Sequence, residues 1–288
     1  MTMPACDLAL EHVAAGYGGD DAVRDLTLHC APGTITAILG ENGSGKSTAL
    51  HVAAGLLAPR RGAVRAGDHT LTATGPSRTA WRARVGFVMH DPDDQLFGSS
   101  VCEDIGFGPV NLGLSHDEVG RRVDEASAAL DLDELHDAAP HVLSHGQKLR
   151  TVIAGIVAMQ PSVLLFDEPT SGLDASSAEA FEVLLLRLRR DGRTIVLSTH
   201  DVDLAWRIAD AVAVLDRGRT VAQGSISHVL GSGAACACIG VRTPSAVAVC
   251  DRLAAIGLMP RGMRSPRTLS DALRLVAPPT THPDGVSA

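Results

Sequence analysis

The alternation of apolar and polar positions predicts a chain in which strands and helices follow one another. Residues 8–15 and 22–30 alternate in part and flank a Gly- and Asp-rich turn at 16–21, which is typical of short strands. Residues 34–39 form a continuous apolar run, which indicates a buried strand, and residues 46–57 have the pattern of a helix. The alternation returns later, with strands expected at 163–166, 194–198 and 211–215 and helices at 176–190 and 203–208.

Residues 91–160 interrupt this alternation. A turn cluster opens the segment at 91–94, and residues 117–130 and 146–159 have helical spacing. Because alternating strands and helices build a mostly parallel sheet covered by helices, we expect an α/β fold. Its parts would be a mostly parallel sheet, an antiparallel β subdomain and an inserted helical subdomain at about 91–160.

The pattern weakens after about residue 232. Residues 231–233 have the composition of a linker, and residues 245–257 and 268–276 predict two short helices. The last dozen residues are rich in Pro, Thr and Gly, and we expect them to be disordered. We therefore divide the chain into a main domain at 1–232 and a small C-terminal extension at 233–288.

Composition and charge argue against a nucleic-acid-binding protein and against a membrane-spanning one. The chain has 288 residues and a formal net charge of −8, so it offers no overall basic field for nucleic acid. The most apolar stretch, residues 152–166, is interrupted by Gln160-Pro161-Ser162 and is too short to span a bilayer. The N-terminus shows no signal-peptide pattern. A membrane process would therefore need another chain for its membrane part.

A glycine-rich loop between a predicted strand and a predicted helix fits the pattern G-x-x-x-x-G-K-[ST]. Glycines let backbone N–H groups wrap around phosphate oxygens, and the following helix adds the positive end of its dipole. Lys46 supplies a compact charge for the β- and γ-phosphates, and Ser47 offers a hydroxyl to Mg²⁺. The nucleotide-binding candidates are Gly40, Glu41, Asn42, Gly43, Ser44, Gly45, Lys46, Ser47 and Thr48.

An acidic pair ends the apolar strand at 163–166. Strand alternation points Asp167 and Glu168 in opposite directions. Asp167 can then hold Mg²⁺ while Glu168 faces an attacking water. ATP hydrolysis needs both charge neutralisation and water orientation, from separate groups.

Four further features complete a recognisable set. Residues 143–147, Leu-Ser-His-Gly-Gln, resemble the L-S-G-G-Q signature of ABC transporter ATPases, and residues 171–174 resemble the loop that crosses their dimer interface. His200 resembles the family's switch histidine, and Tyr17 stands where the family has an aromatic that stacks on adenine. The order and spacing agree over roughly four-fifths of the chain. The sequence thus resembles an ABC-type ATPase with a P-loop NTPase core of the RecA-like kind.

The resemblance implies a head-to-tail dimer with ATP and Mg²⁺ at shared sites. Ser144, Gly146, Gln147 and Asp174 would contact nucleotide bound by the partner chain. Glu168 and His200 would be the catalytic residues, and Ser47 and Asp167 would hold Mg²⁺. His90 stands where the family has a glutamine that senses Mg²⁺. It would take over that role, or it packs at the strand end while Gln95 or water senses the ion.

Within this family, residues 91–97, 103–109 and 111–114 are most similar to energy-coupling-factor importers for cobalt or nickel ions. This resemblance implies a peripheral subunit at the cytoplasmic face of the cell membrane. Its partners would be a second ATPase subunit, a transmembrane coupling protein and a substrate-binding membrane subunit, with no nucleic acid. A vitamin-type cargo is the alternative. The sequence leaves the cargo, and homodimer versus heterodimer, open.

Two rival functions fit less well. An ABC-type ATPase of DNA repair would need a long coiled-coil insertion or a basic groove, and the sequence suggests neither. A small-molecule P-loop kinase would need a lid for its acceptor substrate instead of the signature and the switch histidine.

Overall fold

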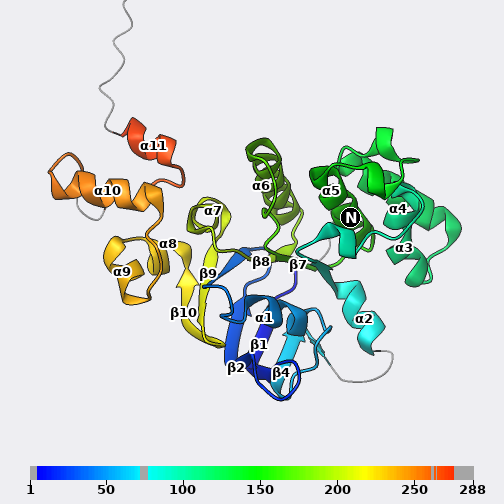
Figure 1. Ribbon diagram of the computed structural model, residues 1–288, viewed down its shortest axis with the longest axis horizontal. Coiled ribbons are helices and arrows are strands. Elements are labelled where there is room, and N and C mark those ends of the chain that lie inside the picture. The colour runs from blue at the N-terminus through cyan, green and yellow to red at the C-terminus, as the bar shows by residue number, and fades with distance from the viewer. Residues whose placement is uncertain (1–4, 72–76, 261–262, 264, 276–288) are drawn as a thin grey trace, which may run out of the picture.

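The fold is built on one ten-stranded sheet with helices on both faces (Figure 1). It was determined as a computed structural model that describes residues 5–71, 77–260, 263 and 265–275. The sheet order is β5-β4-β1-β2-β10-β9-β3-β8-β7-β6. The strands are β1 Leu8–Ala15, β2 Val23–Cys30, β3 Ile35–Leu39, β4 Arg61–Ala66, β5 His69–Thr70, β6 Val85–Val88, β7 Val163–Asp167, β8 Thr194–Ser198, β9 Ala211–Asp216 and β10 Arg219–Ser225.

The sheet has an antiparallel and a parallel part. Strands β5, β4, β1 and β2 pair antiparallel and form an arm. A short parallel contact between β2 and β10 joins this arm to the rest, in which β9, β3, β8, β7 and β6 are all parallel. The expected α/β fold, with a mostly parallel sheet and an antiparallel β part, is confirmed.

The parallel strands are buried on both faces, as their continuous apolar runs predict. In β7, Leu164 and Phe166 belong to one core cluster, and Val163 and Leu165 belong to the other. Helix α1 (Lys46–Ala53) lies between the parallel strands and the arm, whereas α6 (Ala175–Arg190) and α7 (Val202–Ile208) lie on the opposite side (Figure 1). The carboxyl ends of β3, β7 and β8 therefore open toward one site.

A lobe of helices extends beyond β6. Sequence periodicity predicts two of the four α-helices in residues 77–158. Of the two that it misses, one was hidden because Gly106, Gly108 and Pro109 break its apolar pattern. Gly108 is needed there, since a Cβ would stand 2.7 Å from the Met159 sulfur. Residues 77–158 contain α2 Ser77–Arg84, η1 Pro92–Asp94, α3 Val101–Asn111, α4 His116–Ala129, η2 Asp133–Leu135, η3 Pro140–Val142 and α5 His145–Ala158.

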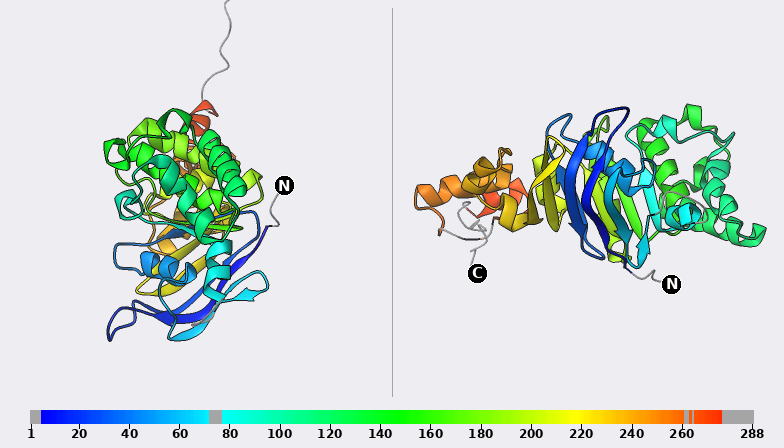
Figure 2. Two further views of the ribbon diagram at one scale, coloured as in Figure 1. Left: turned by 90° about the vertical axis from the view of Figure 1, so that its right-hand side faces the viewer. Right: turned by 90° about the horizontal axis from the view of Figure 1, so that it is seen from below.

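The C-terminal residues form a second lobe at the opposite end of the molecule (Figure 2). It contains α8 Ile226–Leu230, α9 Gly233–Cys238, α10 Ser245–Ala255 and α11 Leu269–Arg274. The linker expected at 231–233 is instead a tight helix junction, because Gly231 ends α8 and the Ser232 hydroxyl caps α9.

This C-terminal lobe is attached to α7. Asp203 accepts hydrogen bonds from Arg242 at 2.6 Å and from the Ser245 backbone at 2.6 Å, and Trp206 donates to the Pro266 carbonyl at 2.8 Å. The disorder expected for the last dozen residues falls outside the described residues. Over the described ranges, no helix is both long and apolar enough to cross a membrane.

Candidate functional site

The loop between β3 and α1 requires its glycines. Gly40 has a φ of 156°, and a Cβ there would stand 2.4 Å from the Leu215 carbonyl oxygen. Gly45 precedes α1 with a φ of 103°, and its Cβ would meet the Ala22 carbonyl oxygen at 3.0 Å. A side chain at either position would push the loop away from the sheet. The loop is therefore held tightly at the amino end of α1.

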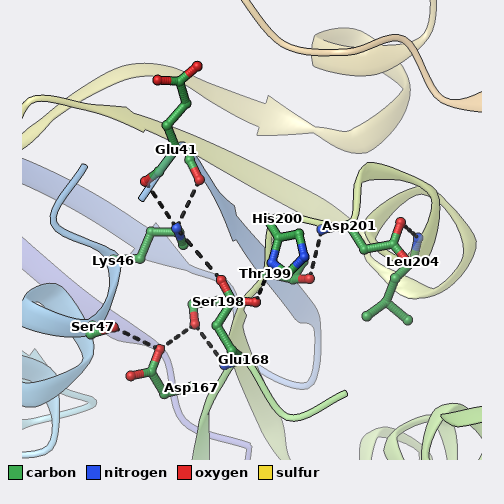
Figure 3. A network of polar contacts seen from close by, with 11 residues as sticks. Glu41, Lys46, Ser47, Asp167, Glu168, Ser198, Thr199, His200, Asp201 and Leu204 are labelled. Carbon is green, nitrogen blue, oxygen red and sulfur yellow. Dashed lines mark hydrogen bonds and ion pairs between the residues drawn. The ribbon is translucent and has the colours of Figure 1, made fainter. Parts of the chain in front are cut away.

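Lys46 is almost fully buried, at 6% exposure, and its ammonium group faces the loop (Figure 3). The ammonium nitrogen donates to the Gly40 carbonyl at 2.8 Å and the Glu41 carbonyl at 3.2 Å. It also stands 3.7 Å from a Glu168 carboxylate oxygen. A buried cation that is bonded mainly to backbone carbonyls is available to an incoming anion.

Asp167 accepts two hydroxyl hydrogen bonds on one carboxylate oxygen. Ser47, in the first turn of α1, donates at 3.1 Å, and Ser198, at the end of β8, donates at 2.6 Å (Figure 3). Asp167 is 5% exposed. The hydroxyl of Ser47 and the carboxylate of Asp167 are hard oxygen ligands of the kind that Mg²⁺ prefers, so this pair fits that ion.

Glu168 departs from the strand geometry expected for it. β7 ends at Asp167, and Glu168 has a left-handed φ of 48°, which costs a non-glycine residue about 1 kcal/mol or more. The two carboxylates still diverge, but this turn, and not strand alternation, separates them. The Glu168 amide donates to the Ser198 hydroxyl at 3.0 Å, which fixes the turn.

His200 meets the other side of the Glu168 carboxylate. Its Nδ1 lies 2.8 Å from a Glu168 oxygen, and its ring is largely exposed (Figure 3). The turn that carries it is fixed, because the Thr199 hydroxyl accepts from the Asp201 amide at 3.0 Å and Asp201 caps α7. Glu168 therefore stands between Lys46 and His200.

Sequence reasoning missed Ser198, which organises both carboxylates. Ser198 was seen only as the last residue of an apolar strand. The parallel register places it directly opposite Asp167, and this register depends on pairing between strands that are distant in sequence. A hydroxyl residue at the end of a strand beside an acidic strand end is the signal that could have found it.

Tyr17 lies at the tip between β1 and β2, and its ring is 60% exposed. Its hydroxyl forms a 2.5 Å hydrogen bond with Nδ1 of His51, a residue of α1 that sequence reasoning did not single out. Burial, and then the charge of Asp167, raise the pKa of the Tyr17 phenol. The ring thus stands on the side of α1 that faces the antiparallel arm.

The signature residues form a second group. The Ser144 hydroxyl caps α5 by accepting from the Gln147 amide, and the Gln147 side chain accepts from the Ser144 amide at 2.8 Å. A Cβ on Gly146 would stand 3.3 Å from the hydroxyl of Ser177 in α6. Asp174 caps α6 by accepting a hydrogen bond from the Ser177 amide. This bond lowers the pKa of the Asp174 carboxyl.

A cavity of about 400 Å³ adjoins this group and is lined mainly by residues of α5 and α6. Within the described part of the chain, no hydrogen bond or ion pair joins the signature group to the phosphate loop, and Figure 1 places α5 and α1 in different parts of the molecule. One chain therefore presents two half-sites: a phosphate loop with its acidic pair, and a signature with two helix caps.

His90 is exposed and lies two positions after the end of β6. The Gln95 side chain is already bonded to the backbone at the end of β6. It accepts from the Met89 amide at 2.6 Å and donates to the Phe87 carbonyl at 3.1 Å. An ion pair at 2.6 Å joins Asp93 to Lys148 beside the signature. Of the two side chains expected to compete for the sensing role, His90 has the more accessible position.

A groove of about 680 Å³ runs between β6, α3 and α5. The exposed rings of Phe97 and Phe107 pack edge to face at 4.4 Å beside it. Asp104, which is 9% exposed, lines the groove and accepts the Phe97 and Gly98 amides on one oxygen. Its other oxygen is buried and has no partner in the described part of the chain. The groove thus presents exposed apolar rings beside a largely buried carboxylate.

Comparison with known proteins gives consistent matches. The family model described as "ABC transporter" matches residues 23–171. The cobalt import ATP-binding protein CbiO of Rhodobacter capsulatus is 50% identical over 241 residues, 82% of this chain and 85% of that protein. The energy-coupling factor transporter ATP-binding protein EcfA of Methanosphaera stadtmanae is 40% identical over 211 residues, 73% of this chain and 76% of that protein.

Solved structures agree. A cbiO1 structure from Clostridium perfringens, described as part of the ABC transporter complex cbiONQ, has a TM-score of 0.72 and 37% identity, covering 78% of this chain and 90% of that one. The ATP-binding cassette MJ0796, in a dimeric post-hydrolysis state bound to ADP and Pi, has a TM-score of 0.68 and 26% identity. It covers 76% of this chain and 98% of its own.

Proposed function

Because this chain belongs to the family of ABC transporter ATP-binding proteins, we propose that the cluster of Lys46, Asp167 and Glu168 is its ATP-hydrolysing centre. The chain is the ATPase subunit of an ABC transporter of the energy-coupling-factor type. The observation that carries the proposal is the Glu168 carboxylate, held between the Lys46 ammonium and the His200 ring beside the phosphate loop.

ATP binding begins at the loop between β3 and α1. Backbone N–H groups of residues 40–48 and the amino end of α1 attract the phosphates. The Lys46 ammonium leaves the Gly40 and Glu41 carbonyls and binds phosphate oxygens instead. Mg²⁺, bound by Ser47 and Asp167, would supply further neutralisation of the phosphate charge. Tyr17 offers an exposed ring to the adenine base.

Hydrolysis transfers the γ-phosphoryl group of ATP to water, and ADP leaves. Glu168 accepts a hydrogen bond from the attacking water and orients it in line with the bond that breaks. His200 holds the Glu168 carboxylate and reaches toward the γ-phosphate from its fixed turn. The Ser198 hydroxyl holds the two carboxylates apart, since it donates to Asp167 and accepts from the Glu168 amide.

A second subunit completes each site. Ser144, Gly146, Gln147 and Asp174 of one copy would contact the γ-phosphate held by the other copy's Lys46. The amino end of α5 then lends its dipole to that phosphate. The separation of the two half-sites within one chain supports this arrangement, as do dimeric cassettes among the structural neighbours. Two bound ATP molecules close the dimer, and hydrolysis releases it.

The groove beside Phe97 and Phe107 is the docking site proposed for a transmembrane coupling protein. Its exposed rings suit the apolar face of a helix. A substrate-binding membrane subunit would complete the importer. The chain would then work at the cytoplasmic face of the cell membrane.

Cobalt or nickel ions are the proposed cargo, because a relative named for cobalt import shares half of the aligned residues. A vitamin-type cargo is the alternative. Purification of the importer with its membrane partners, followed by uptake into vesicles of labelled cobalt, nickel or a vitamin, separates these cargoes. Uptake of the vitamin alone would reject the metal assignment.

The catalytic proposal is tested with Glu168→Gln. This variant should bind ATP normally and lose about 10²–10⁴-fold in turnover, since water orientation fails while the phosphate contacts remain. It should also accumulate as an ATP-bound dimer in light scattering. Glu182→Gln is the matched control, because Glu182 is similarly buried, at 18% against 16% exposure, and is paired with Arg207. Equal turnover in the two variants would reject Glu168 as the catalytic residue.

A further inference from the structure

Three rings contact one another edge to face in a series that runs from Tyr17 to the groove beside Phe97 and Phe107. The Tyr17 hydroxyl binds Nδ1 of His51 at 2.5 Å, and the two rings meet edge to face at 6.4 Å between centroids. On its far side, the His51 ring stands edge to face against Phe87 at 5.4 Å and 89°. Phe87 belongs to β6 and lines the groove. The middle ring, His51, is thus held from both sides.

The Arg60 guanidinium holds the backbone of the tip that carries Tyr17, because it donates to three glycine carbonyls there. These bonds do not involve the Tyr17 side chain. Gly16, Gly18 and Gly19 surround the tyrosine, and Gly18 adopts a φ of 67°. The Tyr17 ring is 60% exposed, so packing alone does not set its direction. The hydrogen bond to His51 therefore sets the direction of the Tyr17 side chain.

His51 also links the base site to the phosphate site. It lies on α1, five positions after Lys46, which is about 7.5 Å along a helix axis. Because α1 is a rigid element that begins at the phosphate loop, a ring anchored to His51 keeps a fixed spacing from the bound phosphates. A Tyr17 ring without this bond would have to be ordered by each nucleotide that binds.

We propose that His51 is a positioning residue that holds Tyr17 ready to stack on the adenine base, with Phe87 fixing the His51 ring from behind. This inference rests on the proposed role of Tyr17 as the base platform. His51 touches neither phosphate nor base. It acts by removing the ordering cost of the Tyr17 side chain, so it raises affinity for nucleotides that carry a base and leaves affinity for bare phosphate chains alone.

The test compares two probes, Mg-ATP and inorganic tripolyphosphate with Mg²⁺, because the second has no base to stack. We expect His51→Ala and Tyr17→Phe each to weaken Mg-ATP binding by about two- to tenfold. Tripolyphosphate binding should not change in either variant. His51→Gln, whose amide can accept the Tyr17 hydroxyl, should restore part of the loss. The double variant should be no weaker than the single ones, because both remove the same bond.

Two controls separate this inference from the proposed function. Tyr17→Ala should weaken Mg-ATP binding by about tenfold or more through lost stacking. His116→Ala, an exposed histidine on α4, should change neither probe. If Tyr17→Ala weakens Mg-ATP binding but His51→Ala and Tyr17→Phe do not, the platform stands and the role of His51 is overturned.

Other results would also overturn the inference. Unchanged Mg-ATP binding in Tyr17→Ala would reject the platform, and the role of His51 with it. An equal loss for both probes in His51→Ala would show that the histidine only supports α1 and the phosphate loop. Tyr17→Phe keeps the exposed ring and removes one hydroxyl, so it remains informative if His51→Ala folds poorly.

Discussion

Removal of the Ser198 hydroxyl should destabilise the chain and slow ATP hydrolysis together. Ser198 is fully buried, and its hydroxyl joins the Asp167 carboxylate at 2.6 Å to the Glu168 amide at 3.0 Å. Ser198→Ala removes one oxygen and leaves the fold of β8 otherwise unaltered. The perturbation is therefore confined to the two hydrogen bonds that separate the acidic pair.

The magnitude follows from these two bonds. A hydrogen bond to a charged group contributes about 1.5–3 kcal/mol to stability, and an amide left without an acceptor costs about 1–3 kcal/mol. The strained φ of Glu168 loses its support at the same time. Because partial relaxation offsets some of this sum, we expect the free energy of unfolding to fall by about 3 kcal/mol. We expect kcat to fall more than the affinity for ATP.

Denaturant unfolding and steady-state ATPase kinetics measure both effects. Ser127→Ala is the matched control, since Ser127 is 1% exposed and its hydroxyl has no hydrogen-bond partner in the described structure. Its replacement should be neutral or slightly stabilising. If Ser198→Ala and Ser127→Ala unfold alike, the hydroxyl bridge contributes nothing measurable. If stability falls while kcat holds, Ser198 supports the fold and does not organise the site.

Two further predictions concern the shared sites and the magnesium contact. Ser144→Arg should bind ATP and fail to hydrolyse it. A mixture of this variant with Lys46→Ala should regain part of the ATPase activity, because the mixed dimer has one intact composite site. ATP hydrolysis by either variant alone, as a monomer, would contradict shared sites. His90→Ala should raise the Mg²⁺ concentration needed for half-maximal ATPase activity and His90→Gln should not; identical Mg²⁺ titrations of wild type and His90→Ala would leave His90 with a packing role only.

The parts of the site that sequence predicts are those built by neighbours in the chain. Gly40 and Gly45 report a backbone that only glycine tolerates, and Lys46 follows them directly. The helix caps at Ser144 and Asp174 also follow from residues within three positions. Such features depend on local geometry, so the sequence pattern is enough to locate them.

The parts that sequence did not predict depend on pairing between distant segments. Ser198 meets Asp167 only because β7 and β8 align in one register, and His51 meets Tyr17 across 34 positions. Helix α3 was hidden by the small residues that let it approach α5 closely. The attachment of the C-terminal lobe to α7 likewise joins Trp206 to Pro266, 60 positions apart. None of these contacts leaves a periodic signal in the sequence.

The proposed division of the catalytic residues between two parts of one chain has a genetic consequence. If two identical copies complete each other's sites and transport requires both sites of a dimer, a defective subunit also stops transport by the intact subunit with which it pairs. With equal amounts of normal and Lys46→Ala chains pairing at random, only about a quarter of the dimers contain two normal subunits. A null allele that removes the protein would lower the dose, whereas a folded but inactive allele would behave as partly dominant in a merodiploid strain.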